Sequence, residues 1–205
     1  MVRADAGTEN VDIKYIQMAL RSFHNDDVAG CRSFTVGKSS ANHQRIEMLW
    51  SFLMPHFTVF WRMFFKDMID AGQLDNTDRT HMECVRFCFL PMIQRHLDTF
   101  RITWNSHRIR NQRSIDGTGR YGIPDVMYHQ PLICEATDWS YEIPANIGVL
   151  DEISHGYTEP KLYRGCSQQF LNRIQFITGV PLEDFDIFQT PSEGRQLFQM
   201  LTSMF

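Results

Sequence analysis

The sequence predicts an α/β fold in which helices dominate. Apolar residues recur at helical spacing over residues 57–71 and again over residues 80–104, which predicts two long core helices. Residues 1–4 and 31–36 are short segments that are followed by a glycine turn and by a Gly-Lys-Ser-Ser loop, a pattern that is typical of strand ends. We therefore expect two short strands ahead of a larger helical part.

The composition fits a globular chain with unevenly distributed charge. Of the 205 residues, 43% are hydrophobic and 21% are charged, which excludes collagen-like, low-complexity and disordered proteins. Residues 1–120 carry 16 Lys and Arg against 13 Asp and Glu, whereas residues 121–205 carry 4 against 11. The first part is therefore the one whose charge favours contact with nucleic acid, and the second argues against it.

Neither the N-terminus nor the most apolar segment predicts a secreted or membrane protein. Asp5, Glu9 and Asp12 stand where a signal peptide needs apolar residues, and charged side chains interrupt residues 52–69. The five cysteines include no Cys-x-x-Cys pair, which argues against a disulfide framework and a zinc ribbon. We expect an intracellular protein without a membrane span.

For the side chains of the two long helices, two interpretations are open: a hydrophobic core or a binding site. Cys84 and Cys88 lie one helical turn apart near His81, which allows either a metal site or small buried residues, and we favour burial. The aromatic stripe is continuous and one-sided, which favours core packing over a cofactor or base-stacking surface. It predicts burial of Phe60, Phe64, Val85, Phe89 and Leu97.

Capping patterns predict where several helices begin and end. Thr80 and Glu83 have the spacing of a capping box at the start of the second long helix, and Gly72 stands where the first should end. Two shorter helices are expected near the end of the chain, one before Gly179 and one beginning at Thr190-Pro-Ser-Glu, with proline at its first position.

Two carboxylates form the candidate site. Asp5 directly follows the first strand, and Glu47 lies on the polar side of the helix after the Gly-Lys-Ser-Ser loop. Ligands gather at the carboxyl ends of strands in open α/β sheets, and Mg²⁺ prefers oxygen ligands. By spacing alone, the alternative is that both acids merely end their elements.

Basic residues accompany these carboxylates and also form a second segment. Cations around Glu47 would neutralise phosphates at the mouth of the site. In the segment after Trp104, DNA contact and a plain solvated surface are equally open alternatives, and Trp104 itself is expected to be buried. The candidate DNA contacts are Arg32, Lys38, His43, Arg45, Arg108 and Arg110.

Several segments together resemble a known family. They look like the integrase core domain proteins encoded in animal genomes, which are retroviral-integrase-like, related to transposons and ribonuclease-H-like in fold. The segments are Val2–Asn10, Gly37–Glu47, Trp50–Leu53, Phe60–Asp67, Glu83–Phe89, Trp104–Arg110 and Pro124–Tyr128.

The resemblance implies an Asp-Asp-Glu polynucleotidyl transferase that uses Mg²⁺ or Mn²⁺ to cut and join DNA in the nucleus, generally as a multimer. By matching position, Asp5 is the second Asp and Glu47 is the Glu. The first Asp of such cores has no counterpart here, so we expect an N-terminally truncated core that is inactive as this fragment. The alternative is a non-catalytic, domesticated or decayed module that binds DNA or protein.

The resemblance also gives an expected domain organisation. Residues 1–131 would form the partial catalytic core, without its first strands. Residues 132–159 contain six acidic residues and neither Lys nor Arg, which predicts an irregular acidic connector. Residues 160–205 would be a small helical C-terminal extension.

Overall fold

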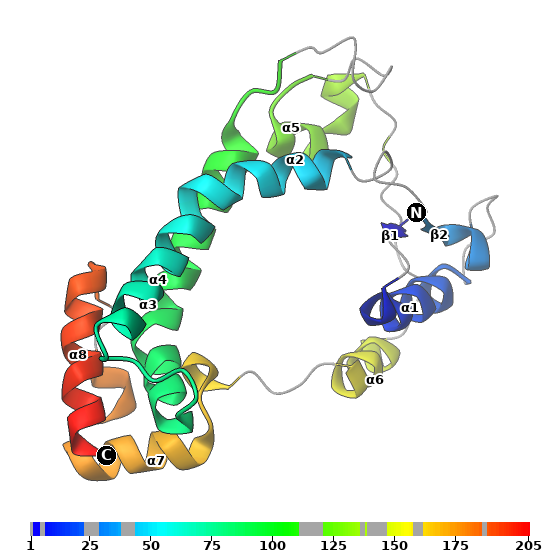
Figure 1. The fold of residues 1–205 in the computed structure, drawn as a ribbon. Helices are drawn as coiled ribbons and strands as arrows, with labels where there is room; N and C mark the ends of the chain where they lie inside the picture. Colours follow the sequence, from blue (N-terminus) through cyan, green and yellow to red (C-terminus); the bar gives the residue numbers. More distant parts are fainter. Residues whose placement is uncertain are drawn as a thin grey trace. The chain divides into compact units, whose positions relative to one another are not determined.

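The structure is a computed structural model that describes residues 2–4, 7–22, 29–37, 44–110, 121–135, 138, 147–157, 162–185 and 188–205. The chain divides into two compact units, residues 1–52 with 139–160, and residues 53–138 with 161–205. Helices make up most of the described residues, and the strands found there form one two-stranded sheet, which confirms the helix-dominated α/β prediction (Figure 1). No helix in the described part is long and apolar enough to cross a membrane.

The first unit contains a strand–helix–strand motif. Strands β1 (Val2–Ala4) and β2 (Phe34–Val36) pair in parallel. Parallel neighbours need a crossover connection, and α1 (Val11–Arg21) supplies it here. A 3₁₀ turn at Thr8–Asn10 precedes α1, and another at Gly30–Ser33 precedes β2. Both predicted strands are therefore present, although the second covers only the last half of residues 31–36, because residues 31–33 belong to the 3₁₀ turn.

Two more helices belong to this unit. Helix α2 (Gln44–Leu53) follows β2 in the chain, as expected, and its last residue is assigned to the second unit. Helix α6 (Ile147–Tyr157) lies within residues 132–159, where the composition predicted irregular backbone. The prediction of irregular backbone was based on the glycines and acids of this segment. It was wrong for residues 147–157, because Ile147, Leu150 and Ile153 have the spacing of one helix face.

The second unit is built on long helices, as the periodicity predicted. A π-helical turn (Met54–Thr58) leads into α3 (Val59–Asp70), and Gly72 follows with a φ of 67°, the left-handed conformation of a C-terminal cap. Helix α4 (Arg79–Ser106) has 28 residues and continues through Pro91.

The hydrophobic core of this unit joins α3 and α4 to the two closing helices, α7 (Gln168–Thr178) and α8 (Pro191–Met204). Phe89 of α4 is fully buried, and its ring lies 5.3 Å from those of Phe64 and Phe65. Gly194 lets α8 approach closely, because a Cβ there would lie 2.8 Å from Cε1 of Phe89. The largest fully buried side chains are Phe87, Phe89, Phe198, Met68, Met92, Leu171, Ile174 and Leu201.

Of the five side chains that were predicted to be buried, one is fully buried and one is exposed. Phe89 is buried, whereas Phe60 is 48% exposed, so the prediction for Phe60 was wrong. Adjacent residues on a helix point about 100° apart. In α3 it is Trp61 that faces the core, at 5% exposure, while Phe60 shares the outer face with Met63. The other three predicted positions, Phe64, Val85 and Leu97, are half-buried.

The start of α4 differs from the predicted capping box. Asp78 is the N-cap, and its carboxylate accepts hydrogen bonds from the backbone N–H groups of Thr80 and His81. Glu83 is buried, and one of its carboxylate oxygens accepts a hydrogen bond from the backbone N–H of Ser167, at 3.2 Å. Glu83 thus joins α4 to the N-terminus of α7.

The predicted capping box of α8 is confirmed. The Thr190 hydroxyl accepts from the Glu193 backbone N–H at 3.3 Å, and the Glu193 carboxylate accepts from the Thr190 N–H at 3.1 Å. Hydrogen bonds from the backbone N–H groups of Thr190 and Gln189 hold the pKa of the Glu193 carboxyl below its usual value. They stabilise the charged form at the start of the helix.

Candidate functional site

The strand–helix–strand motif brings the carboxyl ends of two strands to one edge of the sheet. In the parallel pair, Val2 lies opposite Phe34 and Ala4 lies opposite Val36. The pairing extends one step further, because the Gly37 N–H donates to the Ala4 carbonyl at 2.8 Å. The carboxyl ends of β1 and β2 therefore coincide, and Asp5 follows directly from this edge in the sequence.

Glu47 lies in the first turn of α2, which begins seven positions after Gly37. Its side chain is exposed and makes no hydrogen bond or ion pair with any residue that the structure describes. A carboxylate is favoured near a helix N-terminus, where the backbone N–H groups point outward. Both Glu47 carboxylate oxygens are therefore open to a ligand from solvent.

The remaining predicted residues of the first unit are only partly placed. Asp5, Lys38 and His43 lie outside the described residues, as does the side chain of Arg45. The predicted separation of roughly 4–8 Å between the Asp5 and Glu47 carboxylates lies outside them as well. Arg32 is exposed and precedes β2, so it sits at the opposite end of the strand from Gly37.

Arg108 and Arg110 lie in the second unit, just after α4 ends. Both are exposed and flank Ile109, which forms an antiparallel bridge with Gly122. Trp104, one helical turn before them, is half-buried, with its ring 5.9 Å from that of Phe100. The predicted DNA contacts are thus divided between the two units.

Cys84 and Cys88 are core residues. Both are buried, and burial raises the pKa of Cys84 to about 12 and that of Cys88 further. His81 accepts a hydrogen bond on Nδ1 from the Asp75 backbone N–H at 3.1 Å. No cluster of three or more potential metal-ligating side chains occurs in the described residues. The two neutral thiols pack as apolar groups, which is the interpretation that the sequence favoured.

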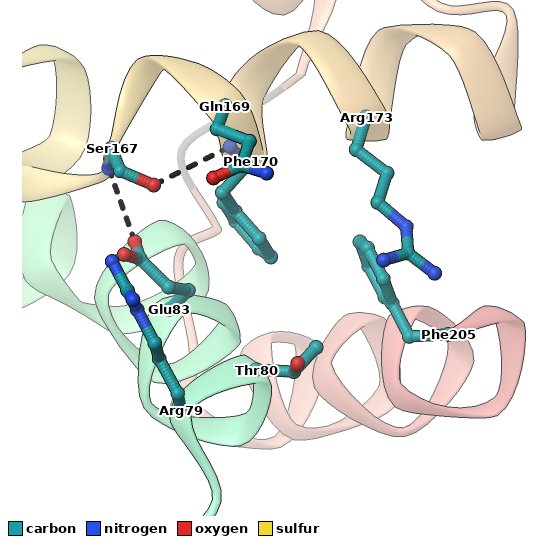
Figure 2. Close-up of a pocket in the computed structure, with 8 residues that line it drawn as sticks. All are labelled: Arg79, Thr80, Glu83, Ser167, Gln169, Phe170, Arg173 and Phe205. Atoms are coloured by element: carbon teal, nitrogen blue, oxygen red, sulfur yellow. Dashed lines mark hydrogen bonds between the residues drawn. The ribbon is translucent and has the colours of Figure 1, made fainter.

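A polar pocket of about 180 Å³, which no sequence pattern predicted, lies between α4, α7 and the residue that follows α8. Figure 2 shows Glu83 and Ser167 on one side of it, joined by the hydrogen bond described above, and Arg173 and Phe205 on the other. No predicted site residue lines this pocket. Its walls come from residues that are far apart in sequence, so no local motif could have revealed it.

The fold and the site define a helix-rich α/β protein with acidic groups expected at the carboxyl edge of a parallel strand pair. The family model described as Integrase core domain matches residues 1–124, and the chain belongs to that family. No curated protein and no solved structure matches the chain. The match indicates a protein of the integrase and transposase type.

Proposed function

We propose that the chain contributes Asp5 and Glu47 to a metal-binding site of the Asp-Asp-Glu type, and that it acts on DNA. One observation carries the proposal: the parallel pairing of β1 and β2 continues to the Gly37–Ala4 hydrogen bond. The residue that matches the second catalytic Asp and the segment that leads to α2 therefore follow strand ends at the same edge, and Glu47 is exposed in the first turn of that helix.

The chemistry of these donors fits Mg²⁺ or Mn²⁺, because both ions prefer carboxylate oxygens. Bound there, such ions supply the charge that activates a nucleophile and stabilises a leaving oxygen in phosphodiester transfer. Asp5 and Glu47 would hold the ion, and the cationic side chains Lys38, His43 and Arg45 would position the phosphates. Glu47 is well suited to this role because its carboxylate makes no bond within the described part of the chain.

The 205 residues supply a match for the second Asp and for the Glu of the class. With two carboxylates, a second ion is bound weakly, and in-line displacement depends on stabilising both oxygens together. We therefore propose that the 205-residue chain by itself handles DNA without cutting it, and that catalysis needs a further carboxylate from outside these residues.

Mn²⁺ binding tests the site. We expect the purified chain to bind Mn²⁺, as measured by the loss of the free-ion electron paramagnetic resonance signal. Glu47→Gln and Asp5→Asn should each weaken Mn²⁺ binding by more than roughly tenfold. Substitution of residues that only hydrogen-bond to metal ligands already lowers metal affinity by about that factor. Glu152→Gln is the matched control, because Glu152 is an exposed acid on α6. Equal binding by all four proteins would contradict the site.

The same preparations test activity. With Mn²⁺, we expect strand transfer and nicking of a DNA substrate to stay at the level of Glu47→Gln. Metal-dependent cleavage that is abolished by Glu47→Gln would show that two carboxylates suffice for catalysis. The proposal that the 205-residue chain does not cut DNA by itself would then be wrong. Weak DNA binding without a Mn²⁺ site would favour the alternative of a non-catalytic DNA-binding module.

A further inference from the structure

The bridge between Ile109 and Gly122 creates a small two-sided surface beyond the end of α4. The Ile109 N–H donates to the Gly122 carbonyl at 2.8 Å, and the Gly122 N–H donates back to the Ile109 carbonyl at 3.2 Å. Side chains alternate between faces along an extended chain. Arg108 and Arg110 therefore share one face with Tyr121, while Ile109 and Gly122 occupy the other.

The exposure of these residues follows that alternation. Ile109 and Gly122 are half-buried, whereas Arg108 and Arg110 are exposed and Tyr121 is 54% exposed. None of the three outward side chains makes a hydrogen bond, ion pair or ring contact with a described residue. The outward face thus presents two guanidinium groups and one aromatic ring without partners in the described part of the chain.

Gly122 fixes this arrangement. Its φ of 151° is a conformation that favours glycine, and a Cβ there would lie 3.2 Å from Cγ of Met127. Helix α5 (Pro124–His129), which carries Met127, therefore packs directly behind the bridge. The outward face is supported from within the second unit and does not depend on the edge beside β1 and β2.

We propose that this face, Arg108, Arg110 and Tyr121, binds an unpaired DNA strand, an inference that rests on the proposed action on DNA. Residues two apart in an extended chain are separated by roughly 6.6–6.8 Å. That is close to the spacing of successive phosphates on one strand, so each guanidinium meets one phosphate. The Tyr121 ring stacks on a base, which a single strand offers and an intact duplex does not.

The surface and the carboxylate site belong to different compact units of the chain. Phosphate contacts and stacking carry no base-specific hydrogen bonds, so the predicted binding is tolerant of sequence. Its role in the proposed function is to hold a frayed or displaced strand while the first unit contacts the rest of the DNA.

Fluorescence anisotropy with the full 205-residue chain tests the proposal, using a labelled single strand of about 15 nucleotides and a duplex of the same sequence. Arg108→Ala with Arg110→Ala should weaken single-strand binding and reduce the salt slope by about 1.4, which corresponds to two phosphates. The charge-matched control changes Arg62 and Arg79 to Ala, because both are exposed cations of the same unit.

Tyr121 gives a second and independent measurement. Tyr121→Ala should weaken single-strand binding by roughly 5- to 150-fold without changing the salt slope or duplex binding, whereas Tyr121→Phe should bind like the parent chain. Tyr157→Ala is the control, because Tyr157 is 56% exposed and lies in the first unit. Retained structure in every variant is checked by circular dichroism.

The outcomes separate this inference from the proposed function. One outcome is that Lys38→Ala and Arg45→Ala weaken single-strand binding, while the variants at Arg108, Arg110 and Tyr121 bind like their controls. This result overturns the inference and leaves the proposed action on DNA intact. A parent chain that binds neither DNA form overturns both. Equal loss of single-strand and duplex binding in Tyr121→Ala would also contradict stacking on an unpaired base.

Discussion

A chain that ends at residue 160 is expected to lose the cooperative unfolding transition of the second unit. The deletion removes α7 and α8, whose buried side chains complete the core around α4. Losing one large core side chain costs roughly 2–5 kcal/mol, against a total stability of about 5–15 kcal/mol for a domain. Urea unfolding followed by far-ultraviolet circular dichroism measures the loss. The buried hydrophobic residues removed are Cys166, Phe170, Leu171, Ile174, Leu197, Phe198 and Leu201.

A point substitution gives the same test within the full chain. Leu201 is fully buried, and Leu201→Ala should lower the free energy of unfolding by about 2–5 kcal/mol. Met200 precedes it and is 42% exposed, so Met200→Ala should change that energy by no more than roughly 0.5 kcal/mol. A cooperative transition in the truncated chain, or equal effects of the two substitutions, would contradict this account of the core.

Arg164 explains why the effect should reach beyond the two helices. Its backbone has a φ of 50°, and its guanidinium donates hydrogen bonds to the carbonyls of Phe87 and Phe185. The same group lies 4.6 Å from the centroid of the Phe87 ring. The segment before α7 is therefore anchored to the N-terminal half of α4. The predicted domain division stays a prediction, and the truncated chain tests whether the C-terminal residues form an extension that the core does not need.

DNA affinity should fall steeply with salt. Three Lys and Arg side chains of the first unit are predicted to meet duplex phosphates, and each contributes about 0.9 to the slope of log affinity against log salt on duplex DNA. A change from about 50 to about 200 mM salt should thus weaken binding by roughly 40-fold. The measurement is anisotropy with a labelled duplex. The side chains are Arg32, Lys38 and Arg45.

Substitutions separate specific contacts from overall charge. Lys38→Ala with Arg45→Ala should reduce the slope by about 1.8, because two phosphate contacts are lost. The change of Arg62 and Arg79 to Ala removes the same charge from residues outside the proposed contacts and should leave the slope within error. A slope near zero for the parent chain would rule out phosphate neutralisation as the basis of binding.

Local patterns predicted most of the helices, although not α6, because the relevant contacts lie within one turn. The capping box at Thr190 and the left-handed Gly72 depend only on near neighbours, and both were found. The role of Glu83 was not predictable, because its partner Ser167 lies 84 positions away. Spacing likewise showed that α3 has an apolar face, while the choice of Trp61 over Phe60 for the core depends on Phe89 and His96 of α4.

The candidate site was predicted through motifs rather than through chemistry alone. Asp5 and Glu47 are two acids among many, and only the surrounding segments single them out. The structure adds the parallel register and the Gly37–Ala4 hydrogen bond, which no pattern in the sequence specifies. The place of Tyr121 beside Arg108 and Arg110 was missed for a similar reason, because the bridge joins residues that are thirteen positions apart in the sequence.

The separation of the Asp5 and Glu47 carboxylates decides whether these two acids form one metal site. A crystal structure of the chain grown with Mn²⁺, with the metal located by anomalous scattering, measures it. We expect the two carboxylates to lie roughly 4–8 Å apart on one concave surface, with the metal density between them. Carboxylates on opposite faces of the first unit, with Mn²⁺ elsewhere or absent, would contradict the account.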